Sequence, residues 1–270
     1  MCKAYSCIVD KNGKVYWKAG LDSHSDIQKQ FKLKEPKLHE PPTNEEIAKK
    51  IQWAKIEITP KDGNYLRSLN RKDWQFNIDE PIKPIWWNEG FIKPCWDSWV
   101  NWKDEIYSKI NLKEARNPIN PLQIKVKEVT KEDIELLKKW ASVRASVWAG
   151  VGASVRASVR ASVGDSVWAS VWDSVRDSVG ANVGDSVGDS VGASVGDSVG
   201  ASVRAYTGSM FLGIDKWKYV DYRKKIFTKG EYPFQSAVTL WKKGLVPSFD
   251  GKIWRLHVGK DAKLVWEGKL

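Results

Sequence analysis

Two side chains in the N-terminal third have the chemistry needed for catalysis. Removal of Met1 would leave Cys2 at the N-terminus, where a thiol can act as nucleophile with its own α-amine as base. The alternative role for Cys2 is the edge of a first strand. His24 lies in Asp-Ser-His-Ser-Asp, residues 22–26, where flanking carboxylates suit a general base or a metal ligand. Ser and Asp ahead of a helix are also ordinary caps, which is the simpler interpretation.

Stronger catalytic signatures are absent from the sequence. It contains no dinucleotide-binding GxGxxG, no P-loop, no GxSxG and no HExxH motif. Its three cysteines are odd in number and lack CxxC spacing, which argues against a disulfide framework and a structural zinc site. We therefore expect no cofactor and no metal, and the sequence leaves enzymatic activity undecided while favouring a protein that is not an enzyme.

Positive charge and tryptophan give the plainer signal, and they favour binding. The chain has 44 basic and 33 acidic residues, a formal net charge of +11, and 16 Trp. Basic side chains neutralise phosphates, whereas Trp and Arg stack on unpaired bases. The candidate binding residues are Trp96, Trp99, Trp102, Arg144, Arg156, Arg160, Arg255 and His257.

Each group of candidates also has a purely structural interpretation. Trp96, Trp99 and Trp102 recur near helical spacing, so they form either a Trp-rich core helix or an aromatic platform for bases or sugars. Period-two alternation predicts that Arg255 and His257 are exposed neighbours on one strand face. Two interpretations are open for this pair: the side chains bind an anion together, or they belong to a solvated strand face.

The centre of the chain is a tandem repeat. Residues 141–204 read as sixteen consecutive tetrapeptides of the form [Ala/Asp]-Ser-Val-[Gly/Arg/Trp]. The third position is Val throughout, and the second is Ser except at Gly150 and Asn182. The first position is Ala ten times and Asp six times. Single-base changes connect the Trp, Arg and Gly codons at the fourth position, so drift of a four-codon unit explains that variation as well as function does.

Three conformations are open for the repeat, and a narrow β-solenoid is favoured. Extended chain places Val and the Ala/Asp position on one side, so short strands joined by tight corners would stack Val into a core. The six Asp at that inward position count against this arrangement. In a helix the Val stripe drifts by about 40° per repeat, and glycine opposes helix formation. A flexible low-complexity spacer is the third alternative.

The flanks of the repeat read as α+β. We divide the chain into an N-terminal α+β domain (1–129), an entry helix (130–140), the repeat region (141–208) and a C-terminal α+β domain (209–270). Asn12-Gly13 predicts a type I′ hairpin turn, and Thr130 to Asp133 is a capping-box start for the entry helix. Further helices are expected at 25–31, 44–51 and 233–243, and strands at 4–9, 14–18, 55–59, 74–78, 252–258 and 262–266.

The segment Met-Cys-Lys-Ala-Tyr-Ser-Cys-Ile-Val at 1–9, the Ser-Val repeat, and the C-terminal segments Pro-Phe-Gln at 233–235 and Ser-Phe-Asp-Gly-Lys-Ile-Trp-Arg-Leu-His at 248–257 carry a family resemblance. The chain resembles a group of uncharacterised bacterial, archaeal and phage proteins in which tetrapeptide arrays of variable length lie between similar flanks. The resemblance implies a microbial or mobile-element context and no particular activity. The repeat is also similar in logic to pentapeptide-repeat proteins, although each unit is one residue shorter.

Two functions from different classes remain open. The favoured one is a non-catalytic repeat scaffold or binding protein whose basic, Trp-rich flanks bind nucleic acid or an acidic protein surface, with the repeat as spacer. The alternative is an enzyme in the N-terminal domain that uses Cys2 as nucleophile. A solenoid with an uncapped last coil would also form an end-to-end homodimer. No apolar run reaches signal-peptide or membrane-span length, so we expect a cytoplasmic protein with no membrane partner.

Overall fold

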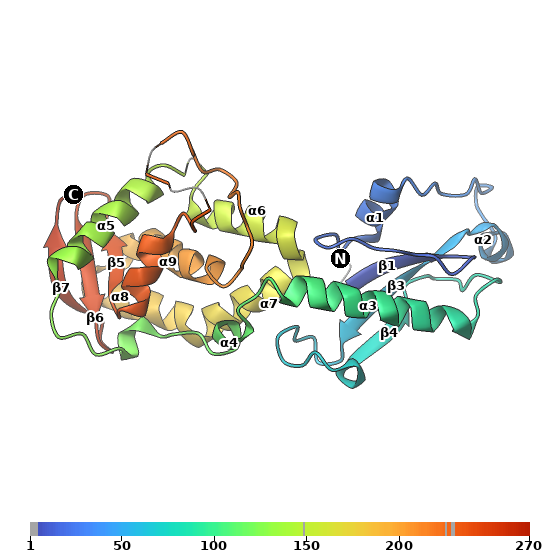
Figure 1. Cartoon of the computed structure of the whole chain (residues 1–270), viewed down its shortest axis with the longest axis horizontal. Coiled ribbons are helices and arrows are strands. Elements are labelled where there is room, and N and C mark those ends of the chain that lie inside the picture. Colours follow the sequence, from blue (N-terminus) through green and yellow to red (C-terminus); the bar gives the residue numbers. More distant parts are fainter. Residues whose placement is uncertain (1–4, 148, 225, 228–229) are drawn as a thin grey trace. The chain divides into compact units, whose positions relative to one another are not determined.

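A computed structural model describes residues 5–147, 149–224, 226–227 and 230–270 (Figure 1). The chain forms two units, each with its own core. Unit 1 comprises residues 1–109 and 160–170, and unit 2 comprises 110–159 and 171–270. Among the described residues, no helix combines the length and the apolar character that a bilayer crossing requires.

Unit 1 is built on a four-stranded antiparallel sheet of order β2-β1-β3-β4. The strands are β1 (Tyr5–Asp10), β2 (Val15–Tyr16), β3 (Trp53–Pro60) and β4 (Trp74–Ile78). The helices are α1 (His24–Phe31), α2 (Asn44–Lys50) and α3 (Ile92–Tyr107), with short 3-10 turns η1 (Arg71–Asp73) and η2 (Glu89–Phe91). Strands and helices therefore occur close to where the sequence predicts them.

Side-chain alternation along β1 and β3 gives the sheet two buried faces. Cys7 of β1 pairs with Ile56 of β3 on one face. Helix α3 covers this face, as the hydrogen bond from the Tyr5 hydroxyl to Ser98 Oγ at 2.6 Å indicates. Ile8 lies on the other face and packs with Ile27 of α1 and Trp53. Packing on both faces fixes the strand register, since a slip by one residue would move every one of these side chains to the opposite face, away from its packing partners.

The hairpin between β1 and β2 forms, but its turn is not type I′. A type I′ turn requires positive φ at both central residues. Only Gly13 has it, with φ of 82°, whereas Asn12 donates its backbone N–H to Asp10 Oδ1 at 2.9 Å. The Asp10 side chain therefore organises this turn in place of a second left-handed residue.

Unit 2 combines helices with a three-stranded antiparallel sheet of order β5-β6-β7. Its flanking elements are α4 (Leu112–Arg116), η3 (Pro121–Gln123), α5 (Lys131–Arg144), α10 (Gln235–Lys242), β5 (Val246–Phe249), β6 (Trp254–Val258) and β7 (Lys263–Gly268). The predicted capping box is confirmed: Thr130 Oγ1 accepts from the Asp133 N–H, and Asp133 accepts from the Thr130 N–H. The strand β5 was not predicted from the sequence.

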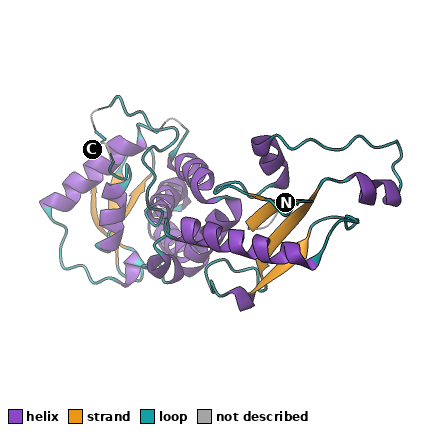
Figure 2. Ribbon diagram, turned by 45° about the vertical axis from the view of Figure 1, so that its right-hand side comes forward, coloured by secondary structure: helices purple, strands orange, loops and turns teal. Residues whose placement is uncertain are grey.

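The repeat is helical, so the predicted narrow β-solenoid is wrong; its helices α6 to α9 are labelled in Figure 1, and Figure 2 shows the helices of the whole chain in purple. After α5, the repeat forms α6 (Val151–Val163), α7 (Asp165–Val175), the π-helical turn η4 (Arg176–Gly180), α8 (Ala181–Val191), η5 (Ala193–Val195) and α9 (Gly196–Gly208). No described residue of the repeat lies in a named strand. The expected end-to-end homodimer loses its basis, because it required stackable solenoid coils.

The aspartates explain why a helix wins over strands. In a helix the first and third repeat positions are about 200° apart, whereas in a strand they share a side. All six Asp of the repeat are exposed, and the third-position valines are buried from Val143 to Val203 except half-buried Val191. A helix thus keeps the carboxylates in water while it buries Val, and packing outweighs the poor helix propensity of Gly and Ser.

Interruptions solve the problem that a four-residue period does not match the α-helix. Helix α6 contains four Val, over which the stripe drifts by about 120°, close to the width of one apolar face. Left-handed glycines then reset the direction at Gly150, Gly164 and Gly192, with φ of 82°, 87° and 94°. The π-helical turn η4 has more residues per turn than an α-helix. A four-residue step there rotates the valine stripe in the opposite direction to the α-helical drift, so this turn also helps to keep Val on the buried side.

Serines at the second repeat position attach the helices to the non-repeat chain of unit 2. The Ser154 hydroxyl donates to the Lys218 carbonyl at 2.5 Å, and the Lys218 N–H donates to Ser158 Oγ at 2.8 Å. Ser198 Oγ accepts from the Phe249 N–H at 2.8 Å. Because these hydroxyls are buried and paired, they add specific contacts beside the valine core.

Two glycines at the same repeat position should respond oppositely to alanine. Gly192 has φ of 94°, whereas Gly188 lies inside α8, and an added Cβ meets no atom within 4 Å at either. We expect Gly192→Ala to lower the free energy of unfolding by about 1 kcal/mol through left-handed strain. Gly188→Ala should raise it by about 0.5–1 kcal/mol through helix propensity. Urea denaturation measures both, and shifts of equal sign would contradict the helical register.

Candidate functional site

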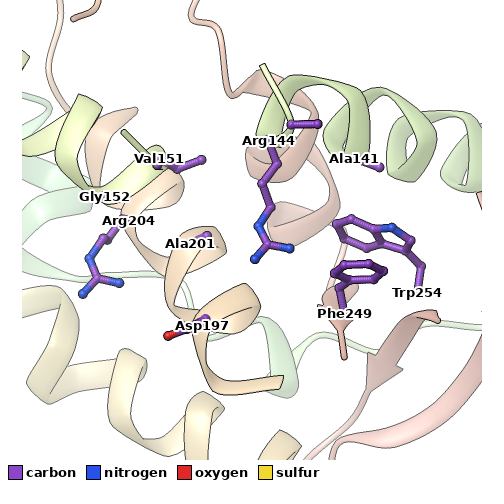
Figure 3. Close-up of a pocket in the computed structure, with 11 residues that line it drawn as sticks. Ala141, Arg144, Val151, Gly152, Asp197, Ala201, Arg204, Phe249 and Trp254 are labelled. Carbon is purple, nitrogen blue, oxygen red and sulfur yellow. The ribbon is translucent and has the colours of Figure 1, made fainter. Parts of the chain in front are cut away.

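A cavity of about 600 Å³ in unit 2 is lined jointly by the repeat and the C-terminal sheet (Figure 3). The repeat contributes Arg144 at the end of α5, the first turn of α6, and Asp197 and Arg204 of α9. The sheet contributes Phe249 and Trp254. The size falls within the range of pockets that enclose small ligands.

Arg144 lies beside an aromatic pair on one wall. Phe249 and Trp254 stack with ring centroids 4.7 Å apart and 23° between planes. The Arg144 guanidinium is 5.7 Å from the Phe249 centroid and 5.9 Å from that of Trp254, within range of a cation–π interaction. Partial burial lowers the pKa of Arg144, and the carboxylate of Asp197 partly opposes this effect. The group nevertheless stays charged, since arginine ionises far above neutral pH.

Arg204 occupies the opposite wall in a space that two glycines leave open. A Cβ at Gly152 would come within 2.5 Å of Arg204 Cδ, and one at Gly200 within 2.9 Å of its Nη1. The guanidinium lies 5.2 Å from the Trp172 ring centroid. Figure 3 shows the Arg144 and Arg204 side chains extending toward the part of the cavity where Asp197 lies.

Ion pairing separates these two arginines from other arginines of the repeat. Arg160 pairs with Asp165, and Arg176 pairs with Asp173 at 3.1 Å and with Asp177 at 2.8 Å. Within the described part of the chain, neither Arg144 nor Arg204 has a carboxylate within ion-pair distance. The cavity therefore keeps a net positive lining, with two guanidinium groups against one carboxylate.

The remaining arginine candidates do not reach this cavity. Arg156 is exposed on α6, and Arg160 belongs to unit 1 with its carboxylate partner. Arg255 is half-buried and bonds Asp250 at 2.7 Å and Glu267 at 3.4 Å. Its charge is therefore already compensated by two carboxylates.

His257 is buried, which corrects the expectation of an exposed neighbour of Arg255. Strand β6 keeps its alternation, because it pairs in unbroken register with β5 and the register shift with β7 places the extra residue on β7. His257 therefore shares a face with Arg255 as predicted, but that face is also buried at this point, so Leu256 and His257 are buried on opposite faces. His257 Nδ1 lies 3.0 Å from the Ala262 carbonyl and Nε2 lies 2.8 Å from Ser248 Oγ. Burial lowers the pKa of His257. The hydrogen bond to the Ala262 carbonyl partly opposes this effect, and the charge of Arg255 lowers the pKa further. The ring therefore connects β6 to Ser248 of β5 and to the turn at Ala262, and it does not form an exposed anion-binding site.

The three tryptophans of α3 are buried in unit 1, so they form its core and no exposed platform. Trp96, Trp99 and Trp102 are 7%, 1% and 3% exposed. Trp74 connects two of them, with centroid distances of 5.1 Å to Trp99 and 6.1 Å to Trp102. Stacking of a base on these rings would require opening the core.

The two catalytic candidates have different outcomes. Cys2 lies outside the described residues. His24 is the first residue of α1 and is 3% exposed, with Nε2 at 3.1 Å from the Ile56 carbonyl. The structure therefore places His24 in a packed environment against the sheet of unit 1.

Sequence reasoning missed Arg204, Asp197, Phe249 and Trp254 as site residues. Arg204 belongs to the repeat but was not predicted as a site residue. Arginine also occupies the fourth position of other repeat units, so the sequence alone does not mark Arg204 as different from them. One partial signal is the spacing of acidic residues. Arg160 and Arg176 have an Asp within five residues in the sequence and pair with it. Arg144, Arg156 and Arg204 have none, so spacing alone does not separate Arg156 from the two cavity arginines.

Comparison with known proteins gives no relative on which to draw: no family model, no curated protein and no solved structure matches this chain.

Proposed function

We propose that this chain is a non-catalytic binding protein whose unit 2 cavity takes a phosphate-bearing segment of single-stranded nucleic acid. The observation that carries the proposal is the pair of arginines without carboxylate partners, Arg144 and Arg204, lining one cavity. Guanidinium groups bind phosphate oxygens through paired N–H donors, and they do so best where water is partly excluded. The net charge of +11 adds long-range attraction for the same ligand.

The other cavity residues suit the remainder of a nucleotide. Asp197 can accept hydrogen bonds from a base amino group, and the Phe249–Trp254 pair gives an apolar wall for a ring. A wall with one carboxylate between two guanidinium groups favours a ligand that combines an anion with N–H donors. A nucleotide unit has both, in its phosphate and in the amino group of its base, together with a ring that can lie against the Phe249–Trp254 wall.

In this proposal the repeat supplies part of the binding site and is more than a spacer. Arg144, Asp197 and Arg204 come from its first, fifteenth and sixteenth tetrapeptides. Helices α5 and α9 bring these distant segments to one cavity, so a change in repeat number would alter the register of the site.

We expect the double variant Arg144→Ala, Arg204→Ala to lose most of its affinity for a fluorescently labelled single-stranded oligonucleotide. Each charge-assisted contact is worth roughly tenfold in affinity, so the double variant should bind about 100-fold more weakly. Fluorescence anisotropy at constant salt measures this loss for the full chain.

Arg156→Ala is the matched control, because it removes the same charge from the same repeat position on an exposed helix face. It should bind within about twofold of the unaltered chain. Equal weakening by Arg156→Ala and by the double variant would show that general charge, and not the cavity, accounts for binding. Absence of binding by the unaltered chain would overturn the proposal and favour an acidic protein partner.

A further inference from the structure

A second chemical cluster lies in unit 1, apart from the proposed nucleic-acid function. It consists of His24 at the start of α1, Glu57 of β3 and Asp79, directly after β4. Each residue offers one ligand atom, and these atoms lie within 4.8 Å of one another. The three residues come from separate elements, so the fold and not local sequence brings them together.

The sheet register explains why the two carboxylates meet. Glu57 pairs with Asn77 across β3 and β4, and Asp79 lies two residues further on, so it shares the same sheet face. Helix α1 covers that face through Ile27. Its first residue, His24, therefore comes down onto the two acidic side chains.

The hydrogen bond of His24 fixes which ring nitrogen faces the acids. Nε2 is 3.1 Å from the Ile56 carbonyl, and a carbonyl only accepts, so Nε2 carries a proton and donates. Nδ1 is then directed at Asp79 Oδ2, 3.3 Å away. An imidazole whose other N–H donates to a backbone carbonyl is the arrangement that commonly orients a metal ligand.

Nδ1 of His24 and the Asp79 carboxylate face each other at a distance that suits a shared positive centre. Glu57 offers a third ligand atom within 4.8 Å of the other two. A second proton on the His24 ring or a metal cation would both fill this place, and the experiment below distinguishes them.

We propose that His24, Glu57 and Asp79 bind a divalent transition-metal ion, with Zn²⁺ the best fit. One imidazole nitrogen and two carboxylate oxygens form a set that suits zinc and leaves a coordination position for water. Half of the Asp79 side chain is exposed, at 51%, which provides an entry path for the ion. The site stands independently of the arginine cavity, so each can fail without the other.

Zinc titration of the chelator-treated full chain, followed by isothermal titration calorimetry at pH 7.5, tests the site. We expect one Zn²⁺ to bind per chain, and Asp79→Asn to weaken this binding by at least tenfold, since it removes a charged ligand from an exposed position. Asp26→Asn is the control, because Asp26 is an exposed carboxylate of the same helix outside the cluster. It should leave zinc affinity unchanged.

Nitrogen chemical shifts of the His24 ring give a second readout that does not depend on the variants. Zinc should shift Nδ1 while Nε2 keeps its proton and its hydrogen bond to Ile56. A folded chain that binds no zinc, or Asp79→Asn binding as tightly as the unaltered chain, overturns the proposal. A doubly protonated His24 ring that zinc does not displace at pH 7.5 overturns it as well, since the proton then fills the place of the metal.

Discussion

Replacing Val155 with Asp is expected to destabilise unit 2 by at least about 3–5 kcal/mol, enough to unfold it at ambient temperature. Val155 is fully buried in α6, and its methyl groups would touch a Cβ built on Gly208 of α9. A carboxylate in this apolar contact has no partner, and an uncompensated buried charge carries a penalty of this size. Loss of helical circular dichroism and of cooperative urea unfolding measures the effect.

Val191→Asp provides the comparison at the same repeat position. Val191 is the last residue of α8 and is only half-buried, so its substituted carboxylate can reach water. We expect a cost of about 1 kcal/mol or less. If the two variants were equally stable, the valine stripe would not be the core of the repeat.

Trp241→Ala should cost about 3–5 kcal/mol, the other large effect we expect. Trp241 of α10 is fully buried and stacks on Tyr206 of α9, with centroids 5.2 Å apart and 18° between the planes. Its Nε1–H donates to the Ile119 carbonyl at 2.9 Å. Truncation removes the ring from the contact between flank and repeat and leaves a buried acceptor unpaired. The midpoint of urea unfolding measures the loss.

A pair of phenylalanine variants separates the ring from its N–H group. Trp99 of α3 is also buried, but its Nε1–H finds no acceptor among the described residues. Trp99→Phe should therefore cost less than Trp241→Phe, because only the latter breaks a hydrogen bond. A larger loss for Trp99→Phe would show that ring volume alone decides both positions.

The flanking elements could be predicted because local signals agreed with tertiary packing. Thr130 and Asp133 mark a helix start through capping, and the alternation from Trp74 to Ile78 marks a strand with one buried face. The expectation for His257 failed for a tertiary reason. Alternation assigns His257 to the same strand face as Arg255, but it does not show that this face is covered by the rest of unit 2 at His257.

The repeat was predicted wrongly because glycine and serine were weighed above the aspartates. Helix propensity describes an isolated segment, whereas the buried valines stabilise these helices through packing. The Asp residues at the first position gave the decisive signal, since only a helix puts them opposite Val. Gly164, at the fourth repeat position, illustrates the limit of the codon argument. A single-base change explains its origin, yet its φ of 87° uses the freedom that glycine provides.

Of the candidate site only Arg144 was predicted, and the sequence did not connect it with the other cavity residues, because the site depends on contacts between distant residues. Arg144 and Arg204 have the same residue type and repeat position as Arg156. What distinguishes them from Arg156 is that they line one cavity, and this follows from how α5, α6 and α9 pack. In a repeat, functional residues are difficult to recognise from sequence, because each copy has nearly the same neighbouring residues along the chain.

A salt series of single-strand binding tests the central claim most directly. For single strands, each phosphate contact contributes about 0.7 to the slope of log affinity against log salt concentration. The double variant Arg144→Ala, Arg204→Ala should therefore have a slope shallower than that of the unaltered chain by roughly 1.4, while Arg156→Ala keeps the original slope. An unchanged slope in the double variant would contradict the claim that these two arginines hold phosphate.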